Sequence, residues 1–223
     1  CLTRYIALLC ACMAVSSFFI GLLLLQIDWT NETKSNLQVA LIQPNISQNQ
    51  KWSPENRQRI LSILERLTMN HWDKDAIIWP EAAIPAIRQN INGFINKLEN
   101  MSLLSGNTLI TGIPTFNSAN GSYHNSVISL GSNSGQYDKT KLVPFGEYVP
   151  GGNSLRGIIK LFNLPMSNFS PGLSDQKPLE IGGHSLATAI CYEVVYPDLV
   201  AKKSRNASML LTVSNDAWFG DSL

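Results

Sequence analysis

Leu186-Ala-Thr-Ala-Ile-Cys-Tyr-Glu193 is a short apolar run that ends in a cysteine and a glutamate. A run of this length, rich in residues that fit a pleated surface, predicts a buried strand. Ala76-Ile-Ile-Trp-Pro-Glu81 has the same organisation, because its apolar residues also end at a carboxylate. Between such runs lie stretches in which apolar residues recur at helical spacing, as at Ile60, Leu64 and Leu67. Strands that alternate with helices predict an α/β layered fold.

The other elements continue this alternation. We expect strands over 37–42, 76–79, 108–114, 123–130, 186–190 and 209–214, and helices that begin at Pro54 and cover 91–101 and 197–205. Asn, Ser and Gly dominate 117–122, which predicts a surface turn between two neighbouring strands.

The chain begins with a long apolar segment. Tyr5 to Ile27 contains no charged residue, and as a helix it would cover roughly 34 Å, enough to cross a hydrocarbon core of about 30 Å. A secretory signal has a shorter apolar stretch followed by a cleavage site of small residues, and a buried core helix is the weaker alternative. Arg4 before the segment and the acidic residues after it place the body outside the cytoplasm. We expect a transmembrane helix over 1–30, a linker over 31–36 and a folded body over 37–223.

Charge is scarce and balanced. Charged residues make up 15% of the chain, against about 25% in an ordinary soluble domain. Without residues 1 to 27, which hold only Arg4, the 17 basic residues fall to 16 and match the 16 acidic ones. A neutral body offers no electrostatic footprint for a polyanion, so a nucleic-acid binder is excluded. A hydrophobic content of 44% excludes disorder.

Several common kinds of site lack support. Cys191 is the only cysteine of the body, so no disulfide scaffold holds the body together. The histidines at 71, 124 and 184 share no ligand spacing, and we expect no metal. No phosphate loop, nucleotide-binding glycine pattern or serine elbow is present, and we expect no cofactor. Of the common kinds of catalytic site, the one that these patterns leave open is covalent catalysis that needs neither a metal nor a nucleotide.

Cys191, Glu81 and the segment Tyr137 to Glu147 lie at expected strand ends or in the loops beside them, where active sites of α/β folds tend to lie. Together they have the groups that thiol acyl transfer requires: a nucleophilic thiolate, a carboxylate base and an ammonium for the oxyanion. Each also has a plainer interpretation, as a small buried residue, a helix-start carboxylate or a solvated loop charge. Strand alternation puts Lys139 and Lys141 on one face, so spacing does not choose between them.

These segments resemble the signatures of the nitrilase superfamily. The resemblance rests on Ile78-Trp-Pro-Glu81, Tyr137-x-Lys139-x-x-Leu-Val-Pro-Phe-Gly-Glu147 and Ile190-Cys-Tyr-Glu193. The apolar helix, Lys51-Trp52 and Ser214-Asn-Asp-Ala-Trp-Phe-Gly220 narrow it to the apolipoprotein N-acyltransferase family. The similarity covers essentially the whole chain. It implies an α-β-β-α sandwich, truncated at its C-terminal end and preceded by the last transmembrane helix of a larger membrane domain.

The resemblance also implies residue roles. Cys191 would be the nucleophile, Glu81 the general base and Lys139 the lysine on the oxyanion side, preferred over Lys141 because the family's lysine stands two residues after the tyrosine. Other matching positions are Glu147, Tyr192 and Glu193 as supporting groups, and Trp52, Trp218 and Phe219 as substrate contacts. For Trp218 and Phe219, packing in the core after a strand is an equal alternative.

The implied reaction moves an acyl chain. Cys191 would take it from a membrane phospholipid, phosphatidylethanolamine in the family, and pass it from a thioester to the N-terminal amine of a diacylglyceryl-cysteine apolipoprotein. The family's enzymes are multi-pass proteins of the bacterial inner membrane with a periplasmic catalytic domain. Pro144 to Phe169 could present an apolar lid to acyl chains or form an ordinary packed loop.

Two other functions stay open. A membrane-tethered nitrilase-type hydrolase would use the same residues but let water resolve the thioester, and a binding module would keep a degenerate site. Family members extend beyond both ends of this chain, so the 223-residue piece is expected to be inactive and poorly stable alone. The physical reason is that missing strands would leave an exposed sheet edge.

Overall fold

A computed structural model describes residues 2–28, 36–148 and 168–216. The chain divides into two compact units, 1–36 and 37–223. The first unit holds one helix, α1 (Leu2–Leu24), whose segment Thr3–Leu24 is long and apolar enough to cross a membrane. α1 is apolar all round and its described side chains are exposed, a composition that suits a helix surrounded by lipid.

Two sheets form the centre of the second unit. The first has the order β1-β2-β3-β4-β5, in which β1 (Val39–Leu41), β2 (Ala76–Ile78) and β3 (Thr108–Asn117) are parallel, and β4 (Ser122–Gly131) and β5 (Gly135–Asp138) add antiparallel pairs. The second has the order β6-β7-β8, in which β6 (Leu179–Ile181) is antiparallel to β7 (His184–Ile190), and β7 is parallel to β8 (Met209–Val213).

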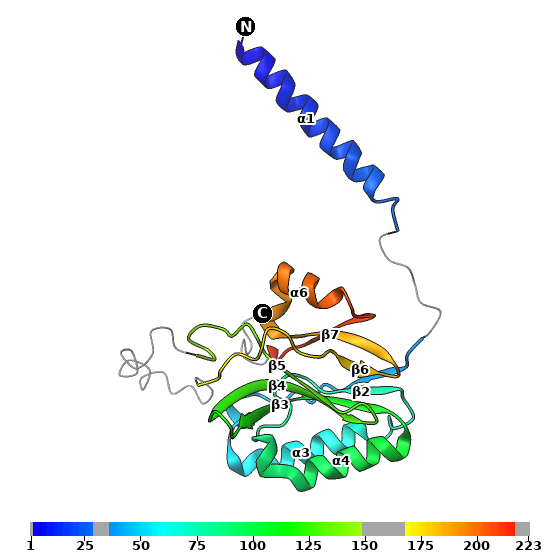
Figure 1. Cartoon of the computed structure of the whole chain (residues 1–223), viewed down its shortest axis with the longest axis vertical. Coiled ribbons are helices and arrows are strands. Elements are labelled where there is room, and N and C mark those ends of the chain that lie inside the picture. Colours follow the sequence, from blue (N-terminus) through cyan, green and yellow to red (C-terminus); the bar gives the residue numbers. More distant parts are fainter. Residues whose placement is uncertain (1, 29–35, 149–167, 217–223) are drawn as a thin grey trace. The chain divides into compact units, whose positions relative to one another are not determined.

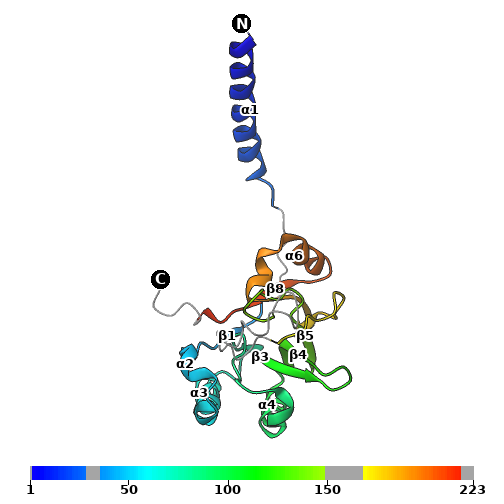
Figure 2. The same ribbon diagram turned by 90° about the vertical axis from the view of Figure 1, so that its left-hand side faces the viewer.

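Helices cover the outer faces of both sheets. α3 (Arg57–Thr68) and α4 (Asn92–Ser105) lie against the first sheet, and α6 (Pro197–Ser204) lies against the second (Figure 1). A quarter turn gives the same order of layers, with α3 and α4 on one side and α6 on the other (Figure 2). The second unit is thus an α-β-β-α sandwich, and the prediction of an α/β layered fold is confirmed.

Strand alternation separates two cores. Ile77 and Leu109 face the helices and pack with Leu64 and Leu98, whereas their neighbour Ile110 faces the second sheet. The core between the two sheets also contains Ala76, Val127, Tyr137, Leu179, Leu186, Ile190, Leu211 and Val213. Because side chains of a strand alternate between its faces, apolar runs in β2 and β3 can supply both cores at once.

Most expected elements are present, with shifted ends. The hairpin of β3 and β4 is confirmed, and its turn contains Gly121 at φ +69°, a conformation that favours glycine. α4 continues to Ser105 rather than ending at 101, because the left-handed cap forms only at Gly106, at φ +71°. The sequence analysis missed β5, β6 and the short helix α2 (Gln48–Lys51), which lack a distinct apolar pattern.

Candidate active site

Three chain segments bring the candidate residues together. Glu81 lies three residues after β2, Lys139 directly follows β5, and Cys191 directly follows β7 at the start of a 3-10 turn, Cys191–Val195. Lys139 Nζ lies 3.6 Å from Glu81 Oε1, and Cys191 is in electrostatic contact with both. Residues 58 and 52 positions apart in the sequence thus meet at one point between the two sheets.

Hydrogen bonds of the two residues before Glu81 fix the chain segment that holds it. Trp79 is fully buried, and its indole N–H donates to Thr68 Oγ1 at 2.9 Å. Gly112 N donates to Pro80 O at 3.2 Å, which ties the turn to β3. Ala82 has φ +44°, so the chain turns sharply directly after Glu81. Glu81 is therefore a buried turn residue, and its interpretation as a helix-start carboxylate is wrong.

A methyl group at Gly112 is expected to displace this turn. A Cβ there would lie 2.6 Å from Glu81 Cα and 2.6 Å from Pro80 O. Both are backbone atoms, so the clash can be relieved only if the whole turn moves. Gly112→Ala should cost about 1–3 kcal/mol of stability and also lower activity, because Glu81 moves. Thermal unfolding and turnover of the full-length gene product measure both effects. Gly93→Ala in α4, with nothing within 4 Å, is the control and should change neither. Equal behaviour of the two variants would contradict this account.

Lys139 is the cation of the site. Its side chain is 1% exposed, and Nζ donates to Glu147 Oε1 at 3.0 Å. Burial disfavours the ammonium, but the carboxylates of Glu81 and Glu147 outweigh burial and raise the pKa of Lys139. Its backbone N–H donates to Asn125 O, and its carbonyl accepts from Gly172 N, both at 2.8 Å. The interpretation of Lys139 as a solvated loop charge is wrong.

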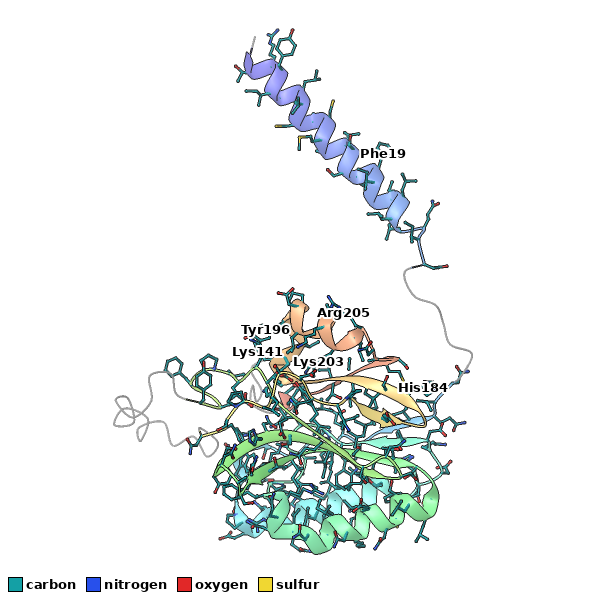
Figure 3. All side chains as sticks on the ribbon, in the orientation of Figure 1. Phe19, Lys141, His184, Tyr196, Lys203 and Arg205 are labelled. Atoms are coloured by element: carbon teal, nitrogen blue, oxygen red, sulfur yellow. The ribbon has the colours of Figure 1, made fainter. Side chains whose placement is uncertain are left out.

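Lys141 lies apart from Lys139, and the expectation that both share one face is wrong. The strand ends at Asp138, so alternation does not continue to residue 141. Lys141 is exposed, with Nζ 5.8 Å from the ring centroid of Tyr196, and both residues are labelled in Figure 3. The structure therefore distinguishes the two lysines where spacing could not.

Asn125 links the two carboxylates. It lies on β4, is 3% exposed, and its Nδ2 donates to Glu81 Oε1 and to Glu147 Oε1, each at 2.8 Å. Glu147 Oε2 in turn accepts from Val143 N at 2.9 Å. Sequence analysis did not single out Asn125, because an asparagine within a strand pattern carries no motif of its own.

Cys191 occupies a strained position at the end of β7. Its φ is +52°, a left-handed conformation that a residue with a Cβ adopts at some cost, and strain of this kind clusters at functional turns. Burial and the charge of Glu81 raise the pKa of the Cys191 thiol, against a hydrogen bond with Ser214 and the charge of Lys139. The thiol is therefore protonated at neutral pH and needs a base to become a nucleophile.

Glu193 links the turn that begins at Cys191 to the segment that holds Lys139. It is fully buried, and Oε2 accepts from Ile190 N at 2.9 Å on the nucleophile side. Oε1 accepts from the backbone N–H groups of Thr140 and Lys141 at 2.8 and 3.0 Å. Tyr137 OH donates to the same carboxylate at 2.9 Å. A carboxylate with this many donors is held firmly, so Glu193 has the contacts of a positioning group.

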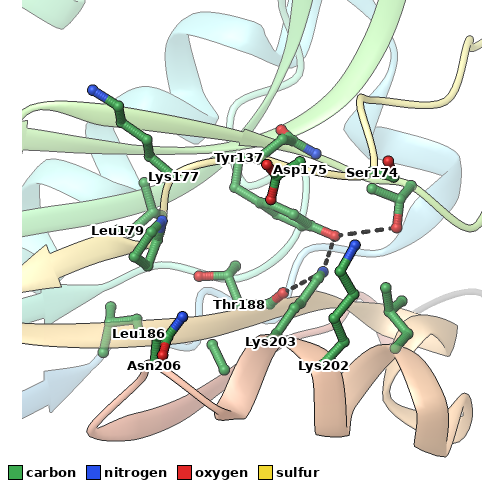
Figure 4. Close-up of a pocket in the computed structure, with 15 residues that line it drawn as sticks. Tyr137, Ser174, Asp175, Lys177, Leu179, Leu186, Thr188, Lys202, Lys203 and Asn206 are labelled. Carbon is green, nitrogen blue, oxygen red and sulfur yellow. Dashed lines mark hydrogen bonds between the residues drawn. The ribbon is translucent and has the colours of Figure 1, made fainter.

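Behind Glu193 lies a cavity of about 460 Å³ between α6, β7 and residues 174–179. Tyr137 and Lys203 point toward one another there and are hydrogen bonded (Figure 4). Lys203 Nζ also donates to Thr188 O at 2.8 Å and lies 3.9 Å from Glu193 Oε2. Burial lowers the pKa of Lys203 to about 8, against the charge of Glu193. These contacts give Glu193 a cation and a tyrosine hydroxyl as further neighbours.

The remaining candidates lie at the margins or outside the described residues. Tyr192 is 55% exposed and makes an edge contact with Tyr196, at 6.0 Å between ring centroids. Trp52 is half-buried, and its indole N–H has no partner among the described residues. Trp218, Phe219 and most of the expected lid, Pro144 to Phe169, lie outside the described residues.

Within the described ranges, no group of three or more His, Cys, Asp or Glu side chains could hold a metal ion.

The model of the family described as Carbon-nitrogen hydrolase matches residues 38–223. The chain belongs to this family. The fold agrees: a carbon-nitrogen hydrolase from Helicobacter pylori superposes with a TM-score of 0.55 at 16% identity, covering 80% of this chain and 59% of that one. Nit3 of Saccharomyces cerevisiae, a member of the nitrilase superfamily, gives 0.55 at 18% identity, covering 82% and 66%. The predicted nitrilase-like sandwich is confirmed.

Relatives with a higher sequence identity have chains longer than this one. A protein named apolipoprotein N-acyltransferase from Pseudomonas syringae pv. tomato is 41% identical over 206 residues, which is 91% of this chain and 41% of the relative. Its namesake in Photobacterium profundum is 42% identical over 222 residues, covering 92% and 43%. The chain spans about two fifths of the length of the curated relatives it matches.

Proposed function

We propose that this chain carries the catalytic domain of an enzyme that transfers an acyl chain from a membrane phospholipid, through a thioester on Cys191, to the N-terminal amine of a diacylglyceryl-cysteine apolipoprotein. The observation that carries the proposal is the meeting of a cysteine thiol, a buried carboxylate and a buried ammonium beside three strand ends. The names of the relatives at about 41% identity supply N-acyl transfer and the apolipoprotein acceptor, and the phospholipid donor comes from the family resemblance.

In the first half-reaction, Glu81 takes the thiol proton, and the Cys191 sulfur forms a bond to the ester carbonyl carbon. The carbonyl oxygen becomes an oxyanion beside Lys139, whose ammonium has three donors and uses one for Glu147. The ester C–O bond then breaks, Glu81 returns the proton to the departing oxygen, and a lysophospholipid leaves. Cys191 remains as a thioester.

In the second half-reaction, the α-amine of the apolipoprotein attacks the thioester carbonyl. Glu81 takes a proton from the amine, and the oxyanion forms again beside Lys139. The C–S bond breaks, the thiolate regains a proton from Glu81, and the amide product leaves. Ester and amine are thereby converted into alcohol and amide, and the protein ends in its starting protonation state.

Exposed apolar side chains beside Cys191 favour an acyl chain over a small polar amide. Tyr192, Val194, Val195 and Tyr196 follow the nucleophile directly, and the first three are each about half exposed. Phe145, near Glu147, is 64% exposed and has φ +62°. Apolar surface of this kind is typical of a site that meets a lipid or another apolar partner. We propose that α1 anchors the domain in the bacterial inner membrane, within a multi-pass protein, and that the domain faces the periplasm.

Intact mass of the full-length gene product, incubated with phosphatidylethanolamine vesicles, tests the proposal. We expect an adduct of one acyl chain that hydroxylamine removes and that Cys191→Ala abolishes. Addition of a diacylglyceryl-cysteine peptide should discharge the adduct onto the peptide amine. Release of free fatty acid without peptide acylation would instead support the tethered hydrolase. A Cys191 that forms no adduct and reacts with no small amide would leave only the binding module.

A further inference from the structure

Lys51 is a buried lysine that the mechanism above does not use. It ends α2 and is 4% exposed, which is rare for a lysine. Its Nζ donates to Glu81 O at 3.3 Å, so its hydrogen-bond partner is the main chain of the proposed base. Lys51 therefore approaches Glu81 from the side of α2, whereas Lys139 approaches from the end of β5.

Packing alone does not account for this ammonium. Burial lowers the pKa of Lys51 to about 8, and the charge of Glu81 offsets only part of the effect. A methionine would fill similar space without the cost of removing a charge from water. A hydrogen bond to a neutral carbonyl stabilises the buried ammonium by less than burial destabilises it. The attraction between the ammonium and the charge of Glu81 is therefore the larger favourable interaction.

The charges around Glu81 explain why a second cation is useful there. Lys139 Nζ lies closer to Glu147 Oε1, at 3.0 Å, than to Glu81 Oε1, at 3.6 Å. One ammonium thus serves two buried carboxylates, and during the reaction negative charge moves from Glu81 to the Cys191 sulfur and the oxyanion without a change in its total. Asn125 contributes donors but no charge. Lys51 supplies the positive charge that the cluster otherwise lacks.

α2 is joined to Glu81 at a further point. Asn215 N donates to Glu81 Oε2 at 3.0 Å, and Asn215 Nδ2 donates to Gln48 Oε1 at 3.1 Å. Gln48 begins the same short helix that Lys51 ends. The base is thus held through its carbonyl and its carboxylate by groups connected to α2.

We propose that Lys51 is a positioning residue for Glu81: its ammonium fixes the backbone of the base, and its positive charge offsets the negative charge of the buried carboxylates beside it. The inference rests on the proposed function in one respect, the role of Glu81 as base. Removal of the ammonium would take the hydrogen bond from Glu81 O and leave the buried carboxylates with one cation fewer.

The test compares Lys51→Met, Lys51→Arg and the unchanged full-length gene product. We expect Lys51→Met to lower kcat for acyl transfer by about 10–100-fold with KM within about twofold. Lys51→Arg keeps the charge and should recover at least part of the rate. Lys97→Met removes an exposed lysine paired with Glu65 and should change neither kcat nor KM.

Alkylation of Cys191 by iodoacetamide separates this inference from the proposed function. The alkylation rate at a fixed pH depends on the base beside the thiol and not on any lipid, so Lys51→Met should lower it even if no acyl transfer is found. A Lys51→Met variant with a lower melting temperature but an unchanged kcat and alkylation rate would overturn the inference. If Lys51→Met does not fold, Lys51→Gln and Lys51→Arg decide it, because only the charged variant should keep part of the rates of the unchanged protein.

Discussion

Lys139→Met is expected to lower the rate of acyl transfer by at least about a thousandfold and the free energy of unfolding by about 3–5 kcal/mol. The side chain is 1% exposed between Glu81 and Glu147, so its removal leaves two buried carboxylates near one another without a cation between them. The oxyanion of both half-reactions also loses its ammonium. Stability and activity should therefore fall together.

Lys141→Met is the matched control for this prediction. It removes the same charge two residues away, but its exposed ammonium contacts only the ring face of Tyr196 among the described residues. Turnover and melting temperature should stay within about twofold and a few degrees of the unchanged protein. Thioester formation, followed by intact mass, should fail in Lys139→Met and persist in Lys141→Met. Equal losses in both variants would contradict the assignment of Lys139.

The strand ends explain how much of the site could be predicted from sequence. Glu81 and Cys191 follow compact apolar runs, and such runs predict buried strands at whose ends active sites of α/β folds tend to lie. That the two strands belong to two different sheets is visible only in the structure. Lys139 was harder to place, because β5 has one buried residue, Tyr137, among polar ones. Its position and its choice over Lys141 come from the resemblance to a family, and the end of the strand at Asp138 gives that choice a physical reason.

Tertiary contacts explain what the sequence could not indicate. Asn125 meets Glu81 only because β4 and the turn after β2 lie side by side, 44 positions apart in the chain. Lys51 stands out in the sequence only by its place beside Trp52, and nothing in the sequence shows that its ammonium is buried against a carbonyl. Glu193 was assigned as a supporting carboxylate, and its contacts with Ile190 and Thr140 give that support a physical form. Its role in the reaction stays a proposal.

Asn125→Asp is the second change for which we expect a large effect. The substitution keeps the shape of the side chain but replaces two donors by a third carboxylate that faces Glu81 and Glu147. The site then holds three buried carboxylates around one lysine. We expect acyl transfer to fall by at least about a hundredfold and stability at neutral pH to fall by about 2–4 kcal/mol.

The sign of the pH dependence distinguishes repulsion from lost hydrogen bonds. The introduced carboxylate has neighbours of like charge, which raise its pKa in the folded state above the unfolded value of about 3.9. A raised folded pKa gives stability that is present at low pH and is lost as pH rises through that pKa. The deficit of Asn125→Asp relative to the unchanged protein should therefore be small near the unfolded pKa and grow toward neutral pH.

Asn125→Ala is the control that separates the two causes. It removes the same donors without adding a charge, so its stability deficit should not change with pH in this way. Melting temperatures of the full-length gene product between about pH 4 and pH 8 measure the difference. If the two variants lose the same stability at every pH, repulsion between carboxylates is not what Asn125 prevents. If Asn125→Asp alone recovers toward low pH, the amide of Asn125 is what allows Glu81 and Glu147 to share one lysine.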